Sequence, residues 1–174
     1  GANLITYRPD LKFQKKIMKI AFQDYGDPDL MSHCMLHAYP IRTAIDLKIP
    51  MILLGENAAY EYSGSNKFNE KFMSSKWFKY YASNAGMTPK KFSKKHTISY
   101  KKLKAYDLPS DRELKKTMAV FCGYFFKWSS ENNLSIAKKY GFKSLSKAAE
   151  GTYRKYVGID EKINRIHQYI KLIK

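Results

Sequence analysis

The chain has 174 residues and a formal net charge of +17 at pH 7, from 32 Lys and Arg against 15 Asp and Glu. This length fits one domain that can bury a real hydrophobic core. No stretch approaches about 18 consecutive apolar residues, and the two cysteines form no disulfide framework. Composition therefore excludes a membrane span and a disulfide-stapled secreted domain, and a reducing cytosol is the expected compartment.

The excess of positive charge raises nucleic acid, acidic membranes and phosphorylated ligands as partners. Most of this charge comes from Lys residues scattered along the chain, and Arg occurs only five times. Arg is the residue favoured for bidentate contacts to phosphates and bases. A solvated Lys-rich surface is therefore favoured over a nucleic-acid groove, and nucleic acid is not the expected partner.

The first elements are predicted from apolar periodicity and capping residues. Residues 4–7 (LITY) predict a strand, and Asp10 is placed to cap a helix over Leu11–Tyr25. A second helical pattern covers residues 31–47, and Pro40 should begin a helical segment or kink one. These elements precede the central strand of the prediction.

Three possible metal ligands lie in the second helix. His33 and His37 are four residues apart and so share a helix face, and Cys34 lies beside one of them. Imidazole and thiolate are ligands of zinc or iron. A fourth ligand is not evident and no CxxC is present. A packed thiol with two partly buried imidazoles is the favoured alternative.

The stretch 49–65, IPMILLGENAAYEYSGS, organises the prediction. Met51–Leu54 is a continuous apolar run between a proline and a glycine, which is typical of a parallel-sheet strand buried on both faces. Ligands of open α/β sheets bind just outside the carboxyl ends of the strands. Gly55 stands at that place and allows a sharp turn or close approach to a ligand. A polar loop after a core strand is the equally open alternative.

Aromatic residues and Lys alternate in the middle of the chain. Residues 68–81 predict a helix whose aromatics pack in the core, stack on bases, or line a sugar or nucleotide pocket. Residues 84–107 carry Gly, Pro and paired Lys and are predicted to be an irregular surface segment or an insertion. Residues 119–128 (AVFCGYFFKW) predict a further strand.

Helix signals recur after residue 109. Ser110 opens a capping-box pattern, and Ser129 or Ser130 should cap the next helix. Residues 145–150 and an amphipathic stretch that starts at Asp160 are also expected to be helical.

The alternation of strands and helices predicts an α/β fold with a mostly parallel sheet flanked by helices. We expect one domain over residues 1–174, with a sheet core at 1–83, an irregular Lys-rich segment at 84–109 and a final strand and helices at 110–174. No GxxxxGK[ST], GxGxxG, GxSxG or HExxH is present. The residues alone therefore predict a ligand-binding α/β domain with a site near residues 55–61.

Six motifs, in this order, carry a resemblance to a known family. They are YGDP at 25–28, YPI at 39–41, IPMILLGENAAYEYSG at 49–64, GYFFKW at 123–128, IAKKYGF at 136–142 and GTYRKYVGIDEKI at 151–163. Together they resemble the N-acetyl sugar amidotransferases of flagellin pseudaminic acid modification and O-antigen (lipopolysaccharide) biosynthesis. That family is similar to the PP-loop ATP pyrophosphatases, so the resemblance implies an adenine-nucleotide α-hydrolase-like fold.

The resemblance also implies an ATP-dependent reaction assisted by Mg²⁺. ATP would activate the carbonyl of an N-acetyl group on a nonulosonate or nucleotide sugar, and ammonia from a glutaminase subunit would displace AMP to give an acetamidino group. An amide oxygen is a poor leaving group, and adenylation makes it a good one. Charge builds on phosphate during this step, so cations are needed nearby.

The family's motifs assign roles to residues of this chain. The resemblance implies that Glu56 or Glu61 binds Mg²⁺ or positions the ammonia, and that Asn57 bonds to nucleotide or sugar. Gly55 and Gly64 would bind the nucleotide. The motif at 123–128 implies that two aromatic residues contact the substrate, and core packing is the alternative. These residues are Tyr124 and Trp128.

The sequence departs from the family in two ways. The SGGxDS loop that cradles the ATP phosphates in PP-loop enzymes does not occur, and only Cys34 stands where the family often has paired cysteines. We therefore expect the central and carboxyl-terminal part of a larger enzyme, inactive alone. Two other classes stay open. One is a PP-loop-type RNA-modifying or nucleic-acid-binding protein, and the other is an interaction module that docks a partner through residues 84–107.

Overall fold

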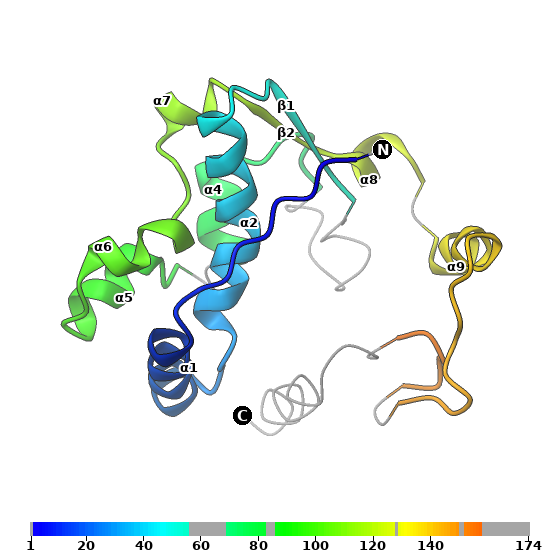
Figure 1. Cartoon of the computed structure of the whole chain (residues 1–174), viewed down its shortest axis with the longest axis horizontal. Coiled ribbons are helices and arrows are strands. Elements are labelled where there is room, and N and C mark those ends of the chain that lie inside the picture. The colour runs from blue at the N-terminus through cyan, green and yellow to red at the C-terminus, as the bar shows by residue number, and fades with distance from the viewer. Residues whose placement is uncertain (1, 56–68, 83–85, 128, 150–151, 158–174) are drawn as a thin grey trace.

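The computed structural model shown in Figure 1 describes residues 2–55, 69–82, 86–127, 129–149 and 152–157. Helix α1 (Leu11–Tyr25) begins at Asp10, whose carboxylate accepts hydrogen bonds from the next backbone amides, and it ends at Gly26 with φ 68°. Helix α2 (Leu30–Asp46) follows and contains Pro40. Both predicted helices are confirmed, because their caps and breakers are local features of the sequence.

The strand predicted at residues 4–7 is wrong. These residues belong to no strand and are exposed, although the ring of Tyr7 stacks on that of Tyr39 with centroids 4.1 Å apart. An apolar, β-prone run becomes a strand only where a neighbouring strand can pair with it. Here the chain instead crosses α2 as an extended segment (Figure 1).

The sheet consists of two parallel strands, β1 (Met51–Leu54) and β2 (Met118–Phe121), with Leu54 paired to Phe121. Phe72 adds an isolated antiparallel bridge to Val120. In the described part of the chain, the α/β class with a parallel sheet is therefore confirmed. The expectation that β1 is buried on both faces is wrong, since Leu53 is 63% exposed and only the other face packs on the core.

The described residues between the strands are more helical than the sequence predicts. Helix α4 (Ser75–Trp77) continues into the π-helical turn η2 (Phe78–Ala82), so the helix predicted at 68–81 is present only from Ser75 onward. Helices α5 (Pro89–Lys95) and α6 (Tyr100–Leu103) and the 3₁₀ turn η3 (Lys104–Tyr106) then replace the predicted irregular segment.

Helix α7 (Asp111–Leu114) precedes β2 and has the predicted capping box, in which the Ser110 side chain and Glu113 bond to each other's backbone. The strand predicted at 119–128 stops at Phe121, because α8 (Cys122–Phe125) starts directly after it. Helix α9 (Ser130–Lys139) is capped by Ser129 as predicted. Residues 145–149 are not helical, and the amphipathic stretch from Asp160 lies outside the described residues.

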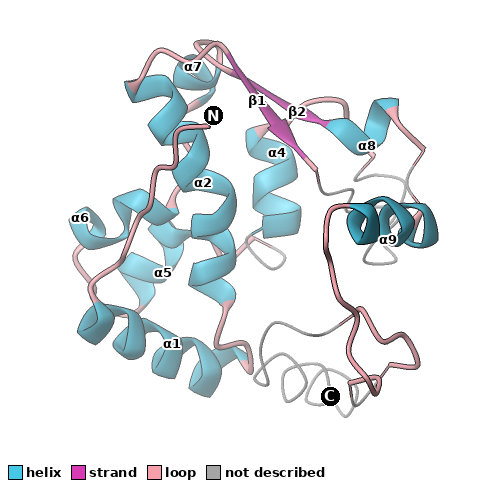
Figure 2. Ribbon diagram, turned by 45° about the vertical axis from the view of Figure 1, so that its right-hand side comes forward, coloured by secondary structure: helices cyan, strands magenta, loops and turns pink. Residues whose placement is uncertain are grey.

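The hydrophobic core lies among α1, α2, the helices between the strands and the inner face of the sheet (Figures 1 and 2). Its largest fully buried side chains come from five helical elements, α1, α2, α5, α6 and η3; they include Ile17, Ile41, Phe92, Leu103 and Tyr106. Helix α9 buries none of its residues and lies away from this core in both views. Within the described residues, no helix has the length and apolarity needed to cross a membrane.

Candidate functional site

The two motifs that carry most of the resemblance leave the sheet at one edge. Strand β1 belongs to the motif at 49–64, and β2 ends two residues before the motif at 123–128. Because the strands are parallel and Leu54 pairs with Phe121, both carboxyl ends meet at the same edge. Segments more than 60 residues apart in the sequence are therefore brought together where α/β folds bind ligands.

Gly55 is exposed at this edge, directly after β1. A Cβ atom at Gly55 would meet no heavy atom of the described residues within 4 Å, and the residue does not have the positive φ that favours glycine. A sharp left-handed turn therefore does not explain this glycine. Open space in front of the backbone remains, and that is what close approach to a ligand requires.

Exposed aromatic side chains lie at the same edge of the sheet as Gly55. The rings of Tyr124 and Phe125 on α8 are 49% and 50% exposed and meet edge to face, with centroids 5.3 Å apart. The amine of Lys71 lies 5.1 Å from the ring centroid of Phe72 and 5.2 Å from that of Phe125. We call these four residues, Lys71, Phe72, Tyr124 and Phe125, the edge patch. Core packing, the alternative considered for Tyr124, is therefore wrong.

The edge patch has the chemistry of a sugar or nucleotide platform. Exposed aromatic faces stack on sugar rings and bases, and a nearby ammonium adds attraction for anionic groups. The motif at 123–128 predicts a substrate role for Tyr124, but no motif pointed to Phe125, Lys71 or Phe72. The three consecutive aromatics at 124–126 were a usable signal, because one short helix cannot bury three neighbouring side chains.

None of the three predicted catalytic residues, and only some of the predicted binding residues, can be placed at this edge. Glu56, Asn57, Glu61, Gly64 and Trp128 all lie outside the described residues. Of the proposed ATP and substrate ligands, the structure thus locates Gly55 and Tyr124. The roles assigned to the others stay predictions.

The possible metal ligands lie elsewhere, under the sheet. The rings of His33 and His37 share a face of α2 as predicted and meet edge to face with centroids 5.0 Å apart. Cys34 is fully buried in the core, about 100° further around the helix from His33. Burial raises the pKa of the Cys34 thiol. Among the described residues, no group of three or more His, Cys, Asp or Glu side chains could hold a metal ion.

His37 belongs to a buried ring cluster that also reaches β2. Its ring centroid lies 5.2 Å from that of Trp77, which in turn lies 4.7 Å from that of Phe121. Tyr81 packs against both the imidazole and the indole. We call His33, His37, Trp77, Tyr81 and Phe121 the inner cluster. The favoured alternative to a metal site, a packed thiol with partly buried imidazoles, matches this arrangement.

Burial sets the protonation of the inner cluster. His37 is 7% exposed, and desolvation, together with the nearby His33, lowers its pKa to about 4. The imidazole is therefore neutral at pH 7. Its Nε2 and the indole Nε1 of Trp77 are buried without a hydrogen-bond partner among the described residues. Such a site is adapted to packing, because an imidazolium there would be poorly solvated.

Comparison with known proteins adds no relative: no protein-family model matches the sequence, and no curated protein matches it. Any functional assignment must therefore rest on the motifs and on the geometry of the edge.

Proposed function

We propose that this chain is part of an ATP-dependent sugar amidotransferase, built on an adenine-nucleotide α-hydrolase-like fold, that converts an N-acetyl group to an acetamidino group. The substrate is a nonulosonate or a nucleotide sugar used in flagellin glycan or O-antigen biosynthesis. The observation that carries the proposal is that the described parts of two motifs, residues 49–55 and 123–127, meet at one exposed edge of a parallel sheet. If the two motifs served only to form the hydrophobic core, they would not both need to be exposed at this edge.

The proposed reaction has two balanced steps. The oxygen of the acetamido group attacks the α-phosphorus of ATP, and pyrophosphate leaves. Ammonia then adds to the activated carbon, the carbon–oxygen bond breaks, and AMP departs with the former acetyl oxygen. A glutaminase subunit is the proposed source of the ammonia. Preorganised dipoles and cations at the phosphates would lower the barrier of the first step.

Among the described residues, three have a role in the proposed reaction. Gly55 lets the nucleotide approach the backbone, and Tyr124 with Phe125 presents ring faces to the sugar. Mg²⁺ would neutralise charge on the phosphates. The residues proposed to hold it, Glu56 and Glu61, lie outside the described part, and no step above depends on their geometry.

The test is product analysis with the complete protein that carries this sequence. It is incubated with ATP, Mg²⁺, ammonium and a panel of N-acetylated nonulosonates and nucleotide sugars. The proposal predicts AMP and pyrophosphate together with a sugar whose mass falls by the difference between oxygen and NH. Release of ADP, or an unchanged sugar with every member of the panel, would contradict it.

A second candidate, an RNA-modifying or nucleic-acid-binding protein, is favoured by one observation. Helices α5 and α6 and the turn η3 carry seven Lys and no Asp or Glu over residues 89–106. These helices and the turn hold the lysines on the surface, an arrangement that suits contact with the phosphate backbone of RNA. Binding of single-stranded RNA that weakens steeply with salt would support this candidate. RNA binding that is absent at low salt would exclude it.

A further inference from the structure

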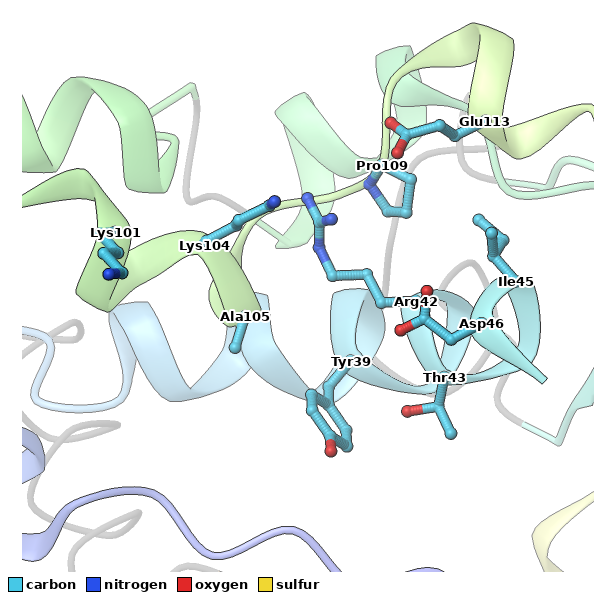
Figure 3. A pocket seen from close by; sticks show the side chains of 10 residues that line it. All are labelled: Tyr39, Arg42, Thr43, Ile45, Asp46, Lys101, Lys104, Ala105, Pro109 and Glu113. Atoms are coloured by element: carbon cyan, nitrogen blue, oxygen red, sulfur yellow. The ribbon is translucent and has the colours of Figure 1, made fainter.

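A hollow of about 400 Å³ lies between the carboxyl-terminal half of α2 and the segment from α6 to α7 (Figure 3). It is near the amino end of β1, since α2 ends at Asp46 and β1 begins at Met51. Gly55 follows the other end of the same strand. The hollow is thus separate from the edge to which the amidotransferase proposal assigns ATP and the sugar.

One cation of the hollow is held in a fixed position. The Nε of Arg42 donates to the backbone carbonyl of Asp107 at 2.6 Å, and its Nη2 donates to that of Leu108 at 3.2 Å. These two bonds tie α2 to the chain that leads into α7. A carbonyl accepts a hydrogen bond but carries no net charge, so the guanidinium keeps its charge and further N–H groups for another acceptor.

Two further cations line the same side of the hollow. Lys101 and Lys104 are exposed, and no salt bridge joins either of them, or Arg42, to a carboxylate of the described residues. In Figure 3 the amine of Lys104 and the guanidinium of Arg42 point toward one another. Like charges repel, so this convergence favours an anion between them.

The two carboxylates of the hollow, those of Asp46 and Glu113, lie on the side of Arg42 that faces away from Lys104 (Figure 3). The carboxylate of Glu113 already accepts hydrogen bonds from Ser110, whose backbone N–H and hydroxyl donate to its Oε2 at 2.9 and 2.7 Å. The carboxylate of Asp46 makes no hydrogen bond or ion pair to a described residue, and Thr43 also lines the hollow. A carboxylate and a hydroxyl together accept and donate hydrogen bonds in the way that sugar hydroxyls require.

We propose that this hollow binds a small phosphorylated sugar. The phosphate sits among Arg42, Lys101 and Lys104, and the sugar hydroxyls bond to Asp46 and Thr43. The volume falls within the range of small-molecule sites. A nucleic-acid backbone fits less well, because its next phosphates would meet the carboxylates of Asp46 and Glu113. The proposal does not depend on the amidotransferase activity, since the two sites lie at opposite ends of β1.

Isothermal titration calorimetry at constant ionic strength tests this site. The ligands are a panel of hexose and pentose phosphates, the parent sugars and inorganic phosphate. We expect at least one sugar phosphate to bind more tightly than either its parent sugar or inorganic phosphate. The double variant Lys101→Gln/Lys104→Gln should weaken that binding by about tenfold or more, since two positive charges near the phosphate are lost.

The matched control is Lys90→Gln/Lys94→Gln, which removes the same charge from exposed positions of α5 outside the hollow. It should bind the sugar phosphate like the unmodified protein, and Asp46→Asn should weaken binding of the sugar phosphate but not of inorganic phosphate. Three results would overturn the proposal: no member of the panel binds, both double variants lose affinity alike, or only single-stranded RNA depends on Lys101 and Lys104. Circular dichroism confirms that each variant is folded.

Discussion

Two groups of aromatic side chains lie near the end of β2, one buried and one exposed. The inner cluster packs Phe121 and Trp77 against the imidazole of His37 beneath the sheet. Two members of the edge patch, Tyr124 and Phe125, follow Phe121 by three and four residues and are half exposed. Phe121 itself is only 5% exposed.

The difference teaches that residue type does not identify a ligand site here. The inner cluster contains the histidines that suggested a metal, yet its geometry is that of a packed core. The edge patch contains no metal ligand or catalytic motif, yet it presents open ring faces beside Gly55. Exposure at the carboxyl edge of the sheet separates this open surface from the packed core, and substitutions in the two groups can test that separation.

The largest expected effect is on the stability of the inner cluster. Phe121→Ala removes a buried ring and leaves a cavity beside Trp77, so the free energy of unfolding should fall by about 3–5 kcal/mol. Urea denaturation followed by tryptophan fluorescence measures it. A loss of less than about 1 kcal/mol would mean that the inner cluster is not a packed core.

The next effect is a pH dependence of stability caused by His37. In the folded protein the pKa of this imidazole is lowered from 6.5 to about 4. Between these two pH values His37 is therefore protonated in the unfolded chain and neutral in the folded one. Stability is therefore fully present above pH 6.5 and is lost as the pH falls toward about 4, by roughly 3 kcal/mol in total. His33 is the titratable neighbour that contributes to the shift.

His37→Phe tests this pH dependence. The variant keeps an aromatic ring and removes the unpartnered Nε2, so it should lose less stability than the unmodified protein as the pH falls from 7 to 4. Urea denaturation at several pH values measures both proteins. Parallel curves would contradict the burial of a neutral imidazole.

A smaller effect is expected for a pair of glycine substitutions. Gly55→Ala should leave stability unchanged or raise it by about 0.5 kcal/mol, because its φ is not positive and the space is open. Gly141→Ala places a side chain at φ +94° and should destabilise by about 1 kcal/mol or more. If Gly55 serves ligand approach, its variant should nevertheless raise the KM for ATP. An unchanged KM would remove that role.

The smallest effect on stability is expected at the edge patch. Tyr124→Ala should change the free energy of unfolding by less than about 0.5 kcal/mol, because the ring is exposed. Its effect should appear in binding, as a weaker affinity for the N-acetylated sugar measured by calorimetry. Tyr140→Ala is the matched control, since that ring is 88% exposed and lies beyond α9. Equal affinities in the two variants would argue against the patch as a sugar platform.

The sequence was informative where structure is decided locally. Asp10 and Gly26 mark the two ends of α1, and the capping box at Ser110 is formed as its spacing predicts. Each of these features needs only neighbouring residues. Strand β1 was also recognised. Its one-sided exposure was not, because the sequence does not say which face a helix will cover.

The sequence was misleading where tertiary packing decides. In α5 and α6 the paired lysines concealed the buried Phe92 and Leu103, which fix that segment on the core. The aromatic run at 119–128 has no periodicity to separate Phe121 from Tyr124. The hollow beside Arg42 could not be foreseen either, since its two sides are about 60 residues apart in the sequence.

The most direct test of the proposed reaction follows the acetyl oxygen. The complete protein is given ATP, ammonium and a substrate whose N-acetyl oxygen is replaced by a heavy isotope, and the AMP is analysed by mass spectrometry. Adenylation predicts that the heavy oxygen is transferred to the phosphate of AMP. Heavy oxygen that stays in the sugar or is released as water would contradict the amidotransferase proposal.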